Sequence, residues 1–127
     1  MAAKEGPSLV MYILLRRDLI AAGDQSLSWP LGALVAQGAH AVSALLWEHK
    51  NDPNVETYMS NIDSMRKVVL AVPSGEELIS LSDRLKAQGI DHRLWVEQPE
   101  NIPTAIAVKP YEKSQVHPLL KKYKLFS

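Results

Sequence analysis

Residues 9–15 have the sequence LVMYILL, an uninterrupted apolar run that ends at the charged residues RRD, 16–18. The apolar residues do not alternate with polar ones, and the run is shorter than an ordinary helix. A strand that is covered on both faces has this pattern, because each of its sides contacts apolar neighbours. We therefore predict a strand here that is buried within a sheet.

The segment KVVLAV at residues 67–72 predicts a second buried strand, which Pro73 ends. Between the two strands we expect a loop over residues 20–28 and then a long helix from Leu31 to about Lys50. Ser28 or Trp29 is placed to cap that helix. The sequence NDP at 51–53 stops it, and residues 55–62 predict a short helix.

The second half of the chain predicts two further strands and two helices. SGEE at residues 74–77 has the spacing of a capping box, and leucines follow at helical spacing up to Gly89. Residues 91–97 and 105–108 predict strands joined by a loop that contains Pro99 and Pro103. Residues 112–123 predict a terminal helix that Pro118 kinks or restarts.

This order of elements predicts an α/β fold, a three-layer α/β/α sandwich around a four-stranded mixed sheet. We expect the first two crossovers to be right-handed and parallel. The connection from residue 97 to residue 105 is too short for a crossover helix, so the last strand is expected to be antiparallel to the third. Residues 1–8 are expected to be a flexible N-terminal segment, and residues 9–127 a single domain.

Composition excludes several classes of protein. The chain has 127 residues, no cysteine, and 14 Lys and Arg residues against 14 Asp and Glu residues. Thiolate catalysis and cysteine-bound metals are therefore excluded, and a zero net charge argues against a dedicated nucleic-acid binder. No signal peptide or membrane-length apolar run is present, so we expect a soluble cytoplasmic protein without a membrane partner.

Polar residues inside the alanine-rich helix are the first candidates for a functional site. Ala33, Gln37, His40 and Ala44 are spaced to share one helix face, with small residues beside the polar ones. A histidine near its reference pKa can accept a proton from water, and a glutamine can orient a substrate carbonyl or that water. A histidine that is partly buried and bonded to the backbone is an equally good interpretation of His40.

The remaining candidates carry weaker signals. His49, His92 and His117 have no ligand spacing, so no metal site is expected. Glu97 or Glu100 could orient an imidazole, although solvated loop charges explain them at least as well. The three tryptophans are expected to be core or lid residues. Basic residues that could meet phosphates are Arg16, Arg17, Arg66, Lys67, Lys121, Lys122 and Lys124; the helix dipole explains the C-terminal ones equally well.

Three segments resemble the type 2 peptidyl-tRNA hydrolase family. WPLGALVAQGAHA at residues 29–41 is similar to the family's signature helix, and its form is closest to the divergent branch called peptidyl-tRNA hydrolase domain-containing proteins. EQPENI at 97–102 and LKKYKLF at 120–126 are similar to that branch as well. The resemblance covers about residues 9–126.

The resemblance implies a three-layer α/β/α domain and hydrolysis of the ester that joins a peptide to the 3′ end of tRNA. It implies no cofactor and no metal. Carried over onto this sequence, the family's site residues match Gln37, His40 and Thr104, and Glu97 stands where the family has an aspartate loop. Typical members carry two lysines at the helix start, where this chain has PLGA at residues 30–33.

Two functions follow from these residues. The first is a peptidyl-tRNA hydrolase in which His40 activates water, Glu97 sets its tautomer, and Gln37, Thr104 and amides at the helix start steady the oxyanion. The second is a noncatalytic adaptor that binds tRNA or a protein partner through the same crevice. Hydrolysis of another acyl ester or amide is a third alternative, and a dimer is one open oligomeric state.

Overall fold

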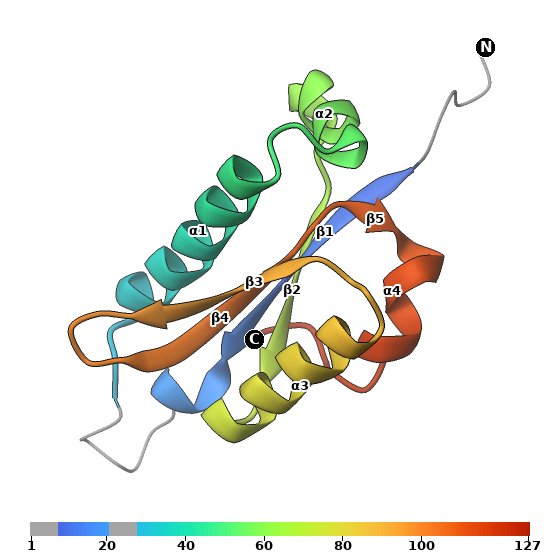
Figure 1. The fold of residues 1–127 in the computed structure, drawn as a ribbon. Coiled ribbons are helices and arrows are strands. Elements are labelled where there is room, and N and C mark those ends of the chain that lie inside the picture. The colour runs from blue at the N-terminus through green and yellow to red at the C-terminus, as the bar shows by residue number, and fades with distance from the viewer. Residues whose placement is uncertain (1–7, 21–27) are drawn as a thin grey trace.

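The computed structural model describes residues 8–20 and 28–127, and Figure 1 shows its arrangement in three layers. A central sheet lies between α1 and α2 on one face and α3 and α4 on the other. The strands are β1 (Leu9–Arg16), β2 (Lys67–Val72), β3 (His92–Glu97), β4 (Ile102–Val108) and β5 (Tyr111–Glu112). The helices are α1 (Leu31–Glu48), α2 (Pro53–Ser60), α3 (Gly75–Ala87) and α4 (Lys113–Leu120), with short 3-10 turns at Arg17–Ile20 and Ile62–Ser64.

The sheet is mixed, as the sequence predicts. Its order is β2-β1-β4-β3, with β1 and β2 parallel and β4 antiparallel to both β1 and β3. The last long strand therefore inserts between the first and the third. The two-residue β5 pairs antiparallel with the start of β1 and was not predicted, because two residues carry no periodic pattern.

The first strand is buried on both faces, which confirms the prediction from residues 9–15. Met11, Ile13 and Leu15 belong to the core under α1 and α2. Val10, Tyr12 and Leu14 belong to the core under α3 and α4, so the strand supplies alternate residues to two separate cores. The three-layer architecture follows from this burial.

The helix ends agree with the sequence in part. Ser74 accepts a hydrogen bond from the Glu77 amide at 3.1 Å, and Gly89 has a φ of +71°, as predicted. The predicted cap of α1 is wrong, because Pro30 occupies the cap position and no side chain bonds the first turn. Ile20 belongs to the first 3-10 turn, and the rest of the predicted loop up to residue 27 lies outside the described residues.

Two further boundaries differ from the prediction in the C-terminal part. Pro103 lies within β4, not in the loop before it, at a position where the strand register shifts. The last helix ends at Leu120, and the residues after it pair with the edge of β2. The Ala71 amide donates to the Lys124 carbonyl at 2.8 Å, and the Phe126 amide donates to the Val69 carbonyl at 3.0 Å. The chain end thus covers a sheet edge that would otherwise be unpaired.

No helix in the described ranges combines the length and the apolar character that crossing a membrane requires.

Candidate active site

A β-bulge at Thr104 shapes the site. Trp95 pairs with Ala105 and Val96 pairs with Pro103, so Thr104 is an extra residue in β4 that has no partner on β3. Regular alternation would point this side chain toward α3, the side that Ile106 faces. The bulge instead directs Thr104 toward α1, on the same side as Ala105 and Ala107.

Thr104 meets Gln37 beneath α1. The Thr104 hydroxyl donates to the Gln37 Oε1 atom at 3.0 Å, and the Gln37 Nε2 atom donates to the Ala33 carbonyl at 3.2 Å. Gln37 is 3% exposed and Thr104 is fully buried. Both polar side chains therefore have partners inside the protein, and this bond joins helix α1 to strand β4 across two distant parts of the chain.

His40 lies one helical turn further along α1, at the surface. Its ring stacks on the Trp95 indole with 5.0 Å between centroids and 25° between planes. In the described part of the chain, neither ring nitrogen of His40 has a hydrogen-bond partner. His92 is the contrasting case, because its two ring nitrogens lie 2.7 Å from the Ser82 hydroxyl and 2.9 Å from the Ile90 carbonyl. The backbone-bonded histidine considered for position 40 occurs at position 92.

Glu97 contacts Trp95, the residue on which the His40 ring stacks. The Trp95 Nε1 atom donates to the Glu97 carboxylate at 2.9 Å, and both side chains are half-buried on the α1 side of β3. Within residues 8–20 and 28–127, no hydrogen bond joins Glu97 to His40. Glu97 therefore does not orient the imidazole directly in this conformation. Its contact is with the indole on which the imidazole stacks.

The indole of Trp95 also contacts a cation. The Arg93 guanidinium lies over the Trp95 ring, 5.6 Å from its centroid, and pairs with Glu48 on α1. Arg93, Trp95 and Glu97 alternate along β3 and so share one face. The sequence analysis did not assign a site role to Trp95 or Arg93. The alternation R-x-W-x-E at residues 93–97 is the signal that could have found them.

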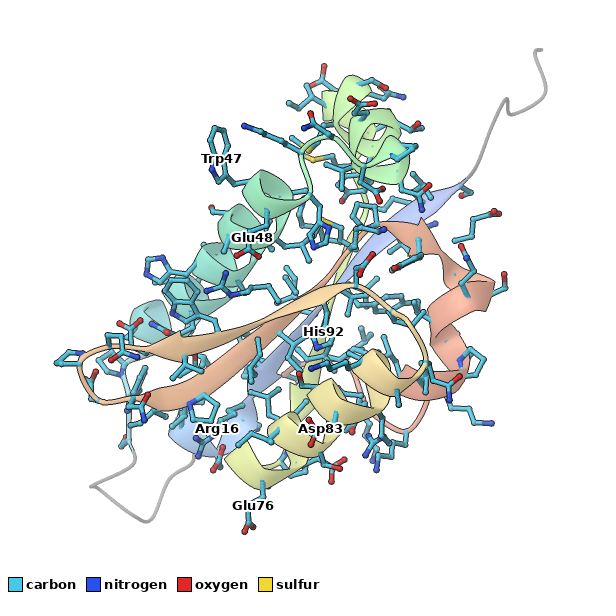
Figure 2. The ribbon with its side chains drawn as sticks, in the orientation of Figure 1. Arg16, Trp47, Glu48, Glu76, Asp83 and His92 are labelled. Atoms are coloured by element: carbon cyan, nitrogen blue, oxygen red, sulfur yellow. The ribbon has the colours of Figure 1, made fainter. Side chains whose placement is uncertain are left out.

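Arg16 ties the bulge to the other face of the sheet. Its guanidinium donates twice to the Asp18 carboxylate, at 3.0 and 2.8 Å, and once to the Pro103 carbonyl at 3.1 Å. A Cβ atom on Gly75 would lie only 2.8 Å from the Arg16 Nη1 atom, so the guanidinium packs against the start of α3. Figure 2 shows Arg16 at the end of the molecule where α3 begins.

The four predicted site residues are thus brought to one end of the sheet, but in two environments. Gln37 and Thr104 form a buried pair. His40 stacks on the Trp95 ring and Glu97 accepts a hydrogen bond from the Trp95 Nε1 atom, and both lie nearer to solvent. Glu100 is exposed, and Trp47 is 71% exposed and so is not a core residue. In the described ranges, no three potential metal ligands gather in one place.

An apolar groove of about 560 Å³ lies along the opposite side of α1, over β1 and β2. Leu31 and Val35 are exposed at its rim, and Phe126 of the C-terminal tail closes one wall. Lys67 is the titratable residue in the lining of the groove, and burial lowers its pKa below the ordinary value. The groove lacks the histidine and carboxylate that acid–base chemistry would use, so we place the candidate site on the β3 side of α1.

Fold and site together define a class, a three-layer α/β protein with a mixed sheet and a largely neutral site built around one surface histidine. The model of the family described as "Peptidyl-tRNA hydrolase PTH2" matches residues 9–126. The chain therefore belongs to the PTH2 peptidyl-tRNA hydrolase family.

Two relatives agree with this assignment, and one solved structure has a similar fold. The human and mouse proteins named "Putative peptidyl-tRNA hydrolase PTRHD1" are each 48% identical over 118 residues, which is 93% of this chain and 82% of each relative. A structure of a protein of unknown function from Agrobacterium tumefaciens has a TM-score of 0.61 at 13% identity. The match covers 94% of this chain and 98% of that one, and it supports the fold alone.

Proposed function

We propose that the protein hydrolyses the ester between a peptide, or an N-blocked amino acid, and the 3′ end of tRNA. Membership in the PTH2 family supports this substrate. The observation that carries the proposal is the position of His40, an exposed imidazole that is stacked on Trp95 and is not bonded to any described residue. A neutral imidazole in that position can accept a proton from a water molecule at neutral pH.

In the proposed reaction, His40 removes a proton from water as the water oxygen attacks the ester carbonyl. The tetrahedral intermediate then expels the ribose oxygen of the tRNA, which takes the proton back from the imidazolium. The products are a free peptide carboxyl group and a tRNA with its terminal hydroxyl restored. The Arg93 guanidinium lies beside the same indole but pairs with Glu48, so it would have to release that carboxylate before it could stabilise the developing oxyanion.

Gln37 and Thr104 act as positioning residues in this proposal. Their side chains are buried and bonded to each other, so contact with substrate would require that bond to break. Holding α1 against β4, they fix the distance between His40 and Trp95. The amides of Leu31 and Gly32, at the uncapped start of α1, lie about 12 Å along the helix from His40. They are therefore too distant to hold the oxyanion of the same carbonyl group.

The test is release of deacylated tRNA from an N-blocked aminoacyl-tRNA by the wild type, His40→Ala and the matched control His49→Ala. Loss of a general base predicts a fall of about 100-fold or more in kcat/KM for His40→Ala. The control changes the same residue type at the end of the same helix and should retain activity. Equal turnover by the wild type and His40→Ala, both folded by circular dichroism, would contradict the proposed role.

The alternative proposal is a noncatalytic member that binds tRNA or a protein partner. The sequence PLGA at residues 30–33, which carries no lysine, favours it. A folded wild type that binds tRNA without releasing deacylated product would support this second function. For both functions we propose a cytoplasmic location.

A further inference from the structure

Positive charge gathers along the edge of the sheet that β2 and the C-terminal tail form. We define the C-terminal basic strip by six residues from four parts of the chain, namely Arg17, Arg66, Lys113, Lys121, Lys122 and Lys124. The strip occurs in a chain whose formal net charge is zero, so basic residues outnumber acidic ones here without an excess in the whole chain. Such a separation of charge creates a local positive field that the total charge conceals.

Two shallow hollows shape the strip. One, of about 410 Å³, is lined by Arg17, Lys122 and Lys124, together with the start of α3. The other, of about 290 Å³, is lined by Arg66, Lys113 and Lys121, together with strand β2. Tyr123 lines both, so the two hollows adjoin on the C-terminal tail.

The tail presents its lysines from a fixed backbone. Leu70 and Leu125 form an antiparallel bridge, and the flanking amide hydrogen bonds extend the sheet by this segment. Lys122 and Lys124 line the same hollow on either side of Tyr123, which is 8% exposed. Anchored cations lose less conformational freedom on meeting an anion than cations on a free tail.

Glu77 is the carboxylate among the described residues that line the two hollows, and it is paired within the protein. Hydrogen bonds from the Tyr123 hydroxyl and the Lys122 ammonium lower the pKa of Glu77 to about 2. Arg84 also donates to this carboxylate, at 3.5 Å. In the described part of the chain, Lys124 and Lys121 form no ion pair, so their charge is available to an external anion.

The strip lies along β2 and the candidate site lies over β3, with β1 and β4 between them, and Arg16 of β1 links the two regions. Arg17 follows Arg16, whose guanidinium donates to the carbonyl of Pro103, the residue before the bulged Thr104. Figure 1 shows the C-terminus beside the sheet, on the side of β2. A polyanion bound along the strip would have to extend past the ends of β1 and β4 to reach His40, as a substrate as long as tRNA can.

We propose that the C-terminal basic strip binds the backbone phosphates of the RNA substrate. This inference rests on the proposed function and extends it, because it supplies the phosphate contacts that the lysine-free start of α1 lacks. An RNA fits better than a lipid surface: the strip is hollowed and Leu125 is its one exposed large apolar side chain. Membrane binding by a basic surface commonly needs a wider apolar face beside it.

The test is binding of fluorescent deacylated tRNA to the wild type, to Lys121→Gln/Lys124→Gln, and to the control Lys50→Gln/Lys86→Gln. Both double variants remove two exposed positive charges. The strip variant should weaken binding by about tenfold and reduce the slope of log Kd against log salt by about 2, since each phosphate contact releases a counterion. The control should bind within about twofold of the wild type.

Equal weakening by the two variants would show a general charge effect and overturn the proposal. The proposal would also be overturned if the strip bound anionic phosphatidylserine vesicles and the strip variant lost no affinity for tRNA.

Hydrolysis assays separate this proposal from the proposed activity. The strip variant should raise KM more than it lowers kcat, whereas His40→Ala should lower kcat and retain tRNA affinity. If the wild type binds tRNA through the strip but does not hydrolyse an acylated substrate, the proposed hydrolase activity is refuted and the proposed tRNA binding by the strip stands. If the enzyme is active and the strip variant has an unchanged KM, the proposed tRNA binding by the strip is refuted and the proposed activity stands.

Discussion

The two ends of strand β4 contain buried polar groups of different kinds. At its start, Thr104 and Gln37 form a neutral pair beside the surface residues His40 and Trp95. Just beyond its end, Lys109 is 6% exposed, and its ammonium binds the carboxylates of Asp52 at 2.7 Å and Asp91 at 2.9 Å.

The charged end is paired within the protein itself. Burial alone would lower the pKa of Lys109, but the hydrogen bonds that its ammonium donates to Asp52 and Asp91 raise the pKa well above the ordinary value. Asp52 also caps α2 by accepting from the amides of Asn54 and Val55. Lys109 therefore joins a helix start, the turn before β3 and the end of β4, and two of its three N–H donors are bonded within the protein.

The difference between the charged cluster and the neutral pair indicates which polar groups stabilise the fold and which are available for function. A buried charge must be paired within the protein, because an unpaired one costs several kcal/mol. A neutral buried pair can position a neighbouring element at smaller cost and leave a nearby surface side chain open. Four predictions test this comparison.

The largest expected effect is on stability at the charged end. Lys109→Ala removes the partner of two carboxylates and should lower the free energy of unfolding by about 3 kcal/mol. Because Asp52 and Asp91 are partly exposed, water takes over part of their solvation and keeps the loss from being larger. Urea denaturation measures the change. A loss below about 1 kcal/mol would show that the cluster is not the stabilising feature we describe.

The neutral pair should be less costly to break. Thr104→Val leaves the Gln37 Oε1 atom without its donor and should lower the free energy of unfolding by about 1–2 kcal/mol. The double variant Gln37→Leu/Thr104→Val should lose less stability than the sum of the losses in the two single variants. Thr104→Ser restores the hydroxyl and is the matched control. If the pair positions His40, kcat should fall in Thr104→Val and recover in Thr104→Ser while KM changes little. Strict additivity would exclude the described bond.

The Glu77 cluster predicts a pH dependence. The pKa of Glu77 lies at about 2, below its ordinary value of 4.5, so its stabilising contribution is complete above pH 4.5 and is lost as the pH falls toward 2. Glu77→Gln should cost roughly 1 kcal/mol at pH 7, because the group lies near the surface, and should flatten the acid limb of the stability profile. Thermal unfolding between pH 2 and pH 7 checks this. An unchanged acid limb in Glu77→Gln would assign acid lability to another carboxylate.

The smallest effect is expected from Trp95→Phe. Phenylalanine keeps an aromatic surface for His40 but removes the Nε1 donor to Glu97, and the half-buried carboxylate can turn to water. We expect a stability change of about 0.5 kcal/mol and a fall in kcat/KM of about threefold. A loss as large as that of His40→Ala would mean that the bond to Glu97, and not the stacking, is the essential feature of Trp95.

Residues 9–15 predicted their strand because a strand that is buried on both faces must be apolar at every position. Residues 67–72 predicted a strand correctly, but β2 lies at the sheet edge, where Lys67 is exposed and Leu70 and Val72 are the buried positions of the strand. The short connection after Glu97 correctly predicted an antiparallel last strand, since so few residues cannot cross the sheet. The predicted cap of α1 failed because a serine or tryptophan near the helix start permits a cap without requiring one. The tail on β2 was missed because its lysines alternate with apolar residues over too few positions to indicate a strand.

Local sequence alone therefore determined the elements, their order and the grouping of Gln37 and His40 on one helix, because each depends on contacts between near neighbours. The tertiary structure decided which groups meet. The bulge that turns Thr104 toward Gln37, the stacking of His40 on Trp95 and the alignment of the C-terminal lysines on β2 all depend on strand register and packing between distant segments. Spacing along one chain does not encode that register, so the sequence could name these residues without placing them in contact.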